Sequence, residues 1–290
     1  MVAKKIMIAG GCSYTDPDYI TSNKDKDQTP GAWPMWPEHL GNKLDLEVVN
    51  TGKCGAGNEE IVHRTMENIL IYGDRVDTVV VLFSEFDRLR WHGITNIAMM
   101  AEVLISEGHN PVFQSKKSMD WRADMGLGDL AHNFFTSKQF PTLRYTYIKY
   151  CLEDNMRRIM MLAEYCKAKN IKFICGQGCT HFQFQFLNRL SEAGFFKAKS
   201  HTPHAEYVKL WTQNPWFGKL ESEWKDNIIG WPFESLLNGY TFDALRYMGK
   251  KPFHWRDDKW NVDEIDLHPN AEAQIIFGDI FYERYQKVYG

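Results

Sequence analysis

The sequence predicts an α/β protein in which a mainly parallel, five-stranded sheet lies between layers of helices. Short apolar runs rich in β-branched residues alternate along the chain with longer segments of helical periodicity. The short runs are nearly continuous in apolar residues, which is typical of strands that are covered on both faces. The length of 290 residues suits one α/β domain with insertions.

Five runs are expected to form the strands, and they span residues 5–9, 46–50, 78–83, 171–175 and 227–230. Helical spacing of apolar residues is found in residues 59–72, 147–169 and 271–285. Asn58 is expected to cap the first of these helices, and Pro269 stands just ahead of the last. Because strands and helices alternate, the sheet is expected to carry helices on both faces.

Two stretches fit this alternation badly, roughly residues 84–142 and 178–265. Neither contains a recognisable linker, so both are interpreted as insertions at the carboxyl ends of the strands. The whole chain, residues 1–290, is therefore predicted to be a single domain. In open α/β sheets the functional site lies at that same edge.

The charge balance argues against several classes of partner. The chain carries 34 basic and 37 acidic residues, so it lacks the basic excess expected of a nucleic-acid-binding protein. It contains no apolar run of about 18 residues, and no membrane span is expected. The apolar stretch at residues 6–9 is shorter than the core of a signal peptide. A cytoplasmic protein without a signal peptide is predicted.

The six cysteines form no C-x-x-C pair, and four of them lie in apolar segments. A chain of this length builds a core without disulfides, so free and mostly buried thiols are expected. The histidines and cysteines do not show metal-ligand spacing, and no metal site is predicted. No phosphate-binding fingerprint is matched either, and no cofactor is expected.

Three short motifs carry groups suited to chemistry. Ser13 follows the first strand in a glycine-rich turn, where its hydroxyl would be exposed. Gly52, Gly55 and Gly57 follow the second strand and precede a helix, which presents backbone N–H groups to an anion. His268 precedes the last helix, in a segment rich in acidic residues. There a carboxylate can orient the imidazole, which can then act as base toward a serine.

Taken together and in this order, the motifs resemble those of the SGNH (GDSL-like) hydrolase family. The G-C-S-Y-T run at residues 11–15 resembles that family's nucleophile turn, and the D-L-H-P run at residues 266–269 resembles its last block. The resemblance spans residues 6–285 and implies a flavodoxin-like three-layer α/β/α sandwich. It also implies a catalytic triad of Ser13, His268 and Asp266, with backbone N–H groups of Ser13 and Gly55 in the oxyanion hole.

The chain departs from the family pattern in three places. Cys12 stands where the first block has aspartate, and only one residue separates Asp266 from His268, so Asp263 or Glu264 are alternative acids. The third block lacks its oxyanion-binding asparagine, because residues 83–88 read F-S-E-F-D-R with Phe86 at that place. Ser84 or Asn58 is expected to supply the replacement donor.

The resemblance implies a serine esterase without a cofactor, acting on a small ester and most plausibly on an O-acetyl group of a carbohydrate. The alternative is a non-catalytic protein on the same scaffold that binds glycans, self-associates or takes part in virion assembly. Divergent members with such insertions resemble phage or marine bacterial proteins, and a phage-encoded chain would be virion-associated. The second insertion contains Trp211, Trp216, Trp224 and Trp231, for which burial is favoured over sugar stacking.

Overall fold

The computed structural model describes residues 4–18, 34–86, 140–179, 205–234, 241–242 and 268–290. The statements that follow concern these residues. Of the two stretches interpreted as insertions, the structure describes residues 84–86 and 140–142 of the first. Of the second it describes residues 178–179, 205–234 and 241–242. The expectation of a single domain stays a prediction.

The described strands form one parallel sheet with the order β2-β1-β3-β4-β5. Its strands are β1 (Ile6–Gly11), β2 (Glu47–Asn50), β3 (Val76–Phe83), β4 (Lys172–Gln177) and β5 (Ile228–Ile229). All five runs expected from the sequence contribute a strand, which confirms the predicted fold class. Strand β5 is shorter than expected, because it pairs only with Cys175 and Gly176 of β4.

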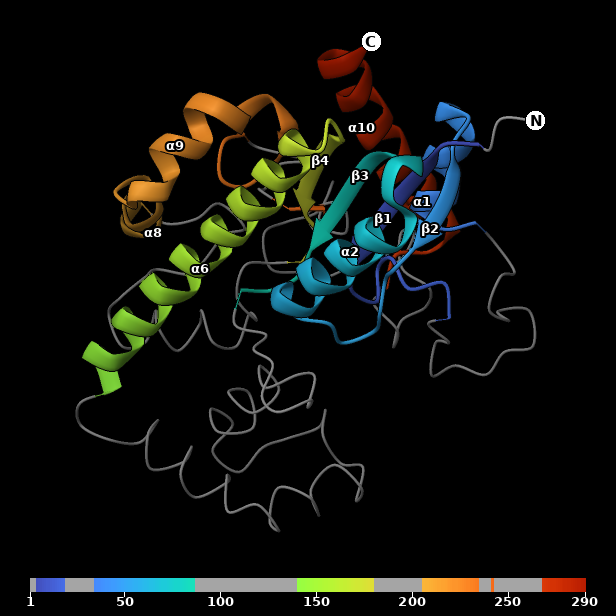
Figure 1. The fold of residues 1–290 in the computed structure, drawn as a ribbon. Helices are drawn as coiled ribbons and strands as arrows, with labels where there is room; N and C mark the ends of the chain where they lie inside the picture. The colour runs from blue at the N-terminus through green and yellow to red at the C-terminus, as the bar shows by residue number, and fades with distance from the viewer. Residues whose placement is uncertain (1–3, 19–33, 87–139, 180–204, 235–240, 243–267) are drawn as a thin grey trace.

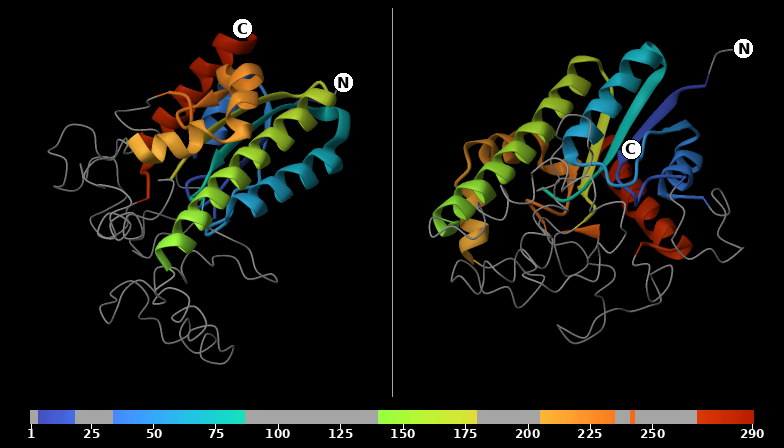
Figure 2. Two further views of the ribbon diagram at one scale, coloured as in Figure 1. Left: turned by 90° about the vertical axis from the view of Figure 1, so that its left-hand side faces the viewer. Right: turned by 90° about the horizontal axis from the view of Figure 1, so that it is seen from below.

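Helices cover both faces of the sheet (Figure 1 and Figure 2). Helices α2 (Asn58–Tyr72) and α6 (Phe140–Ala168) pack on one face, and α1 (Trp36–Leu44) and α10 (Ala271–Tyr289) pack on the other. Helices α8 (Ala205–Thr212) and α9 (Pro215–Trp224) lie beside α6, near β5. The sequence predicted α2, α6 and α10 but missed α1, α8 and α9.

Asn58 does not cap helix α2, contrary to expectation. The N-cap is Gly57, and Asn58 is the first residue of the helix, with its side chain directed to the end of β3. At the start of α10 the side chain of Asn270 caps the helix by accepting a hydrogen bond from the Ala273 N–H.

The layer of α1 and α10 is fastened by large aromatic side chains. The rings of Trp36 and Phe281 have centroids 4.7 Å apart, and Phe242 stacks on Phe281 at 5.0 Å. Trp211, Trp224 and Trp231 are buried, as favoured from the sequence, and Trp216 is partly buried. These tryptophans therefore belong to the core and do not form an exposed platform for sugars.

All six cysteines are free thiols, as predicted, and only Cys54 is exposed. Burial raises the pKa of the Cys166 thiol to about 12, so this group is protonated and unreactive near neutral pH. No helix among the described residues is long and apolar enough to cross a membrane.

Two helical glycines, one packed and one open, test the packing of α1. A Cβ added at Gly41 of α1 would lie 2.1 Å from Cγ2 of Val48 on β2, whereas one added at Gly218 of α9 meets nothing within 4 Å. We expect Gly41→Ala to lower the free energy of unfolding by about 1–3 kcal/mol through overpacking. Gly218→Ala should raise it by about 0.5–1 kcal/mol through helix propensity. Urea unfolding of both variants checks the opposite signs, and an unaffected Gly41→Ala protein would contradict this packing.

Candidate active site

Ser13 and His268 meet at the carboxyl edge of the sheet. Ser13 lies two residues after the end of β1, and His268 lies three residues before the start of α10. His268 Nε2 and Ser13 Oγ are 2.8 Å apart, which is a hydrogen-bond distance between residues 255 positions apart in the chain. Ser13 is only 6% exposed. The 2.8 Å distance between Ser13 Oγ and His268 Nε2 is within the range that a serine nucleophile and its general base require.

The turn that carries Ser13 is tight and held from several sides. The backbone N–H groups of Thr15 and Asp16 both donate to the carbonyl of Cys12, at 2.9 and 3.0 Å. The Thr15 hydroxyl accepts from the indole N–H of Trp36, and the Thr15 carbonyl accepts from the side chain of Asn50. These bonds fix the backbone on both sides of Ser13.

Gly10 and Gly11 belong to β1 and not to the turn, contrary to the expectation from the sequence. They continue the pairing with β3 at Val81 and Leu82. The requirement for glycine at position 11 is steric, because an added Cβ would lie 2.0 Å from Oγ1 of Thr15. The turn itself begins at Cys12, whose sulfur lies 3.7 Å from that of Cys179 at the end of β4.

The glycine-rich loop after β2 lies against the turn of Ser13. The Lys53 N–H donates to the carbonyl of Gly11 at 3.1 Å, and the Cys54 N–H donates to the Asp16 carboxylate at 2.7 Å. Gly55 has a φ of 77°, in the left-handed region that favours glycine. Among the described residues, no acceptor is bonded to the backbone N–H of Ser13 or of Gly55. The expected role of both groups in an oxyanion hole stays a prediction.

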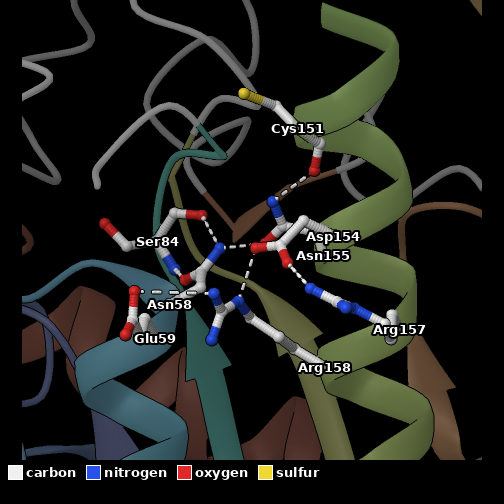
Figure 3. Close-up of polar contacts among 8 residues, drawn as sticks. All are labelled: Asn58, Glu59, Ser84, Cys151, Asp154, Asn155, Arg157 and Arg158. Atoms are coloured by element: carbon white, nitrogen blue, oxygen red, sulfur yellow. Dashed lines mark hydrogen bonds and ion pairs between the residues drawn. The ribbon is translucent and has the colours of Figure 1, made fainter. Parts of the chain in front are cut away.

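Asn58 and Ser84 are hydrogen-bonded to each other at the end of β3 (Figure 3). The Asn58 side chain accepts from the Ser84 N–H at 2.7 Å and donates to the Ser84 carbonyl at 3.1 Å. Its second N–H donates to the side-chain oxygen of Asn155, and the Ser84 hydroxyl donates to the carboxylate of Glu85 at 2.6 Å. The amide hydrogens of Asn58 and the donors of Ser84 are thus all occupied. The two residues expected to replace the missing asparagine are therefore engaged within the protein, and their role at an oxyanion stays a prediction.

The same network includes two residues that sequence reasoning missed, Asn155 on α6 and Gln177 at the end of β4. The Gln177 amide donates to the carbonyls of Ser84 and Cys179, and the Asn155 amide donates to the carbonyl of Cys151. Both side chains are buried. The signal that the sequence offered for Asn155 was its place on the apolar stripe of α6. A polar residue at such a place is expected to be buried, but the pattern does not identify its partner.

Ion pairs beside this network join α6 to α2. Arg158 binds Asp154 one turn earlier on α6 at 2.6 Å and reaches Glu59 of α2 at 3.5 Å (Figure 3).

Phe86, which occupies the place of the missing asparagine, is buried against Trp231 with ring centroids 4.6 Å apart. The segment Ser84–Phe86 therefore serves in packing and in anchoring the end of β3.

The acid partner of His268 is not placed. Asp266, Asp263 and Glu264 all lie outside the described residues, so the choice among them stays a prediction. The ring of Tyr14 stands edge-on to the His268 imidazole, with centroids 5.6 Å apart. The part of the chain that the structure describes contains no cluster of three potential metal ligands.

No protein-family model matches the chain, and no curated protein matches it. Several solved structures resemble it over most of its length. A protein of the G-D-S-L lipolytic family from Desulfitobacterium hafniense DCB-2 shares 11% identity at a TM-score of 0.44, covering 97% of this chain and 99% of that chain. A catalytic mutant of an acetylxylan esterase from Geobacillus stearothermophilus shares 10% identity at a TM-score of 0.43, with coverages of 97% and 93%.

An alpha/beta hydrolase from the metagenome of Lake Arreo, Spain, shares 13% identity at a TM-score of 0.40, with coverages of 99% and 97%. The G-D-S-L protein carries the name of the family that the sequence motifs resemble. At these identities and TM-scores, none of the three assigns a substrate or a catalytic residue to this chain. None is named as a phage protein, so the phage-type resemblance stays a prediction.

Replacing Asn58 by Asp tests the network at the end of β3. Asn58→Asp keeps the acceptor for the Ser84 N–H but sets a carboxylate oxygen against the Ser84 carbonyl and the Asn155 side-chain oxygen. We expect a loss of about 2–3 kcal/mol in unfolding free energy, because buried polar groups lose their partners. The matched control is Asn68→Asp on the same helix, where a half-buried amide donates to the Arg64 carbonyl. Equal effects of the two substitutions in urea unfolding would contradict the network.

Proposed function

We propose that the protein is a serine esterase and a divergent member of the SGNH-like hydrolases. The observation that carries this proposal is the 2.8 Å contact between His268 Nε2 and Ser13 Oγ at the carboxyl edge of a parallel sheet. A serine is a weak nucleophile unless a neighbouring base removes its proton, and an imidazole at this distance can do so. The order of motifs along the chain supports the same assignment.

In the proposed reaction, Ser13 Oγ attacks the carbonyl carbon of the ester while His268 Nε2 takes the hydroxyl proton. The tetrahedral intermediate collapses, its bond to the alkoxy oxygen breaks, and His268 returns the proton to the leaving alcohol. Water then attacks the acyl-serine, again giving a proton to His268. The carboxylic acid leaves, and the proton goes back to Ser13. Asp266 is proposed to orient the imidazole.

The backbone N–H groups of Ser13 and Gly55 are proposed to bind the oxyanion. No side-chain donor joins them among the residues that the structure describes just after β3, since those of Asn58 and Ser84 are engaged. Loss of one oxyanion donor typically lowers the rate about 10²- to 10³-fold. A slow esterase is therefore expected. The O-acetyl group of a carbohydrate is proposed as substrate, and this finer assignment is supported by the family resemblance of the motifs.

Covalent labelling by a fluorophosphonate tests the nucleophile. We expect one adduct on the wild-type protein by intact mass, and none on Ser13→Ala, because the attacking oxygen is lost. The His268→Ala protein should label at least about 10²-fold more slowly, since the base is absent. Ser222→Ala is the matched control, because Ser222 is an exposed serine on α9 whose hydroxyl bonds a carbonyl of its own helix.

Full labelling of the Ser13→Ala protein would refute the assignment. A folded wild-type protein that takes up no label would favour the non-catalytic alternative. The observation that specifically favours that alternative is the engagement of the Asn58 and Ser84 donors within the protein. Ester hydrolysis should then be absent, and binding of acetylated glycans would be the property to measure.

A further inference from the structure

Gln274 joins the helix that follows His268 to the turn that carries Ser13. It lies in the first turn of α10 and is 1% exposed. Its side-chain N–H donates to the Tyr14 carbonyl at 3.1 Å, and its side-chain oxygen accepts from the Trp36 N–H at 3.0 Å. One buried amide thus connects α10 to the residue after Ser13 and to the first residue of α1.

The start of α10 links the position of Gln274 to that of His268. The Asn270 side chain accepts from the Ala273 N–H at 3.1 Å, and its carbonyl accepts from the Gln274 N–H at 2.9 Å. Pro269, the one residue between His268 and this cap, is buried. His268 therefore lies two residues before a capped helix end, which fixes its backbone relative to α10.

Tyr14 receives contacts from the same helix on its side chain. Its ring packs edge-on against His268 and lies 6.5 Å from the ring of Phe277, one turn after Gln274. The carbonyl of Tyr14 is held by Gln274, and its ring is held between His268 and Phe277. Ser13 is the neighbour of Tyr14, so a shift of the Tyr14 backbone displaces Ser13 Oγ from His268.

From these contacts we infer that Gln274 is a positioning residue that sets the distance between Ser13 Oγ and His268 Nε2. This inference rests on the proposed function of the two residues. The Gln274 amide touches neither reacting group and acts by fixing the two backbone segments that carry them. Its role differs from core packing, because its two bonds run to backbone groups of α1 and of the nucleophile turn.

The test compares Gln274→Met with Gln286→Met in the full chain. Methionine keeps the length of the side chain but makes neither hydrogen bond, and Gln286 is an exposed residue on the same helix. The probe is a fluorophosphonate, measured as maximal labelling rate and half-saturating concentration. Small displacements of reacting groups slow a reaction strongly, so we expect the maximal labelling rate of Gln274→Met to fall about 10- to 100-fold. The half-saturating concentration should stay within about threefold.

A maximal rate within about twofold of wild type would overturn the inference, and so would a change confined to the half-saturating concentration. Gln286→Met should label like wild type. If Gln274→Met does not fold, Gln274→Asn replaces it, because the shorter amide cannot span both the Tyr14 carbonyl and the Trp36 N–H. Its expected effect is smaller but in the same direction.

A second measurement separates this inference from the proposed function. The NMR signal of the His268 ring, assigned by its loss in His268→Ala, senses the edge-on ring of Tyr14. It should move in Gln274→Met and stay in place in Gln286→Met. If Ser13 of the wild-type protein takes up no label, the proposed esterase activity is refuted. A shift of the His268 NMR signal in Gln274→Met would still support the positioning role. An unmoved signal overturns that role whether or not Ser13 is reactive.

Discussion

Strand β1 is hydrogen-bonded in parallel to β2 on one side and to β3 on the other, so the loops after these strands leave the sheet at one edge. This places the turn of Ser13 between the glycine-rich loop and the Ser84 segment. Helix α10 packs with α1 on one face of the sheet, and His268, three residues before α10, lies at the same edge within 2.8 Å of Ser13 Oγ. The contact between Ser13 and His268 therefore depends on β1 and α10 being in place.

Buried and half-buried amides hold this edge together. The buried side chains of Asn58 and Gln177, with Asn155 bonded to Asn58, anchor the end of β3. The half-buried Asn50 and the buried Gln274 anchor the turn of Ser13. An amide both donates and accepts, so one side chain satisfies backbone groups of two segments at once. Such groups are costly to leave unpaired when buried, which favours a single arrangement of the loops. The donors of Asn58 and Ser84, which were expected from the sequence to bind an oxyanion, are engaged in this anchoring.

The sequence predicted the elements whose signal is local. Continuous apolar runs indicated the strands, and the positions after them indicated Ser13 and the glycine-rich loop. Helix α1 was missed because Pro37 and Gly41 interrupt its pattern, although Pro37 lies in the first turn, where its missing N–H is not needed. The tertiary roles of Asn155 and Gln274 were not predictable, because their partners Asn58 and Tyr14 lie more than 90 positions away in the sequence. Asn58 suits a helix cap by local rules, but its tertiary contact with Ser84 prevailed.

In the proposed mechanism, His268 activates Ser13 as an acyl acceptor. Rapid quenching of the protein during reaction with p-nitrophenyl acetate, followed by peptide mass mapping, can detect this acceptor. We expect an acetyl group on the peptide containing Ser13 in the wild-type protein and none in His268→Ala. Turnover of the ester with the acetyl group on another residue, or with no acetyl group on Ser13, would contradict it.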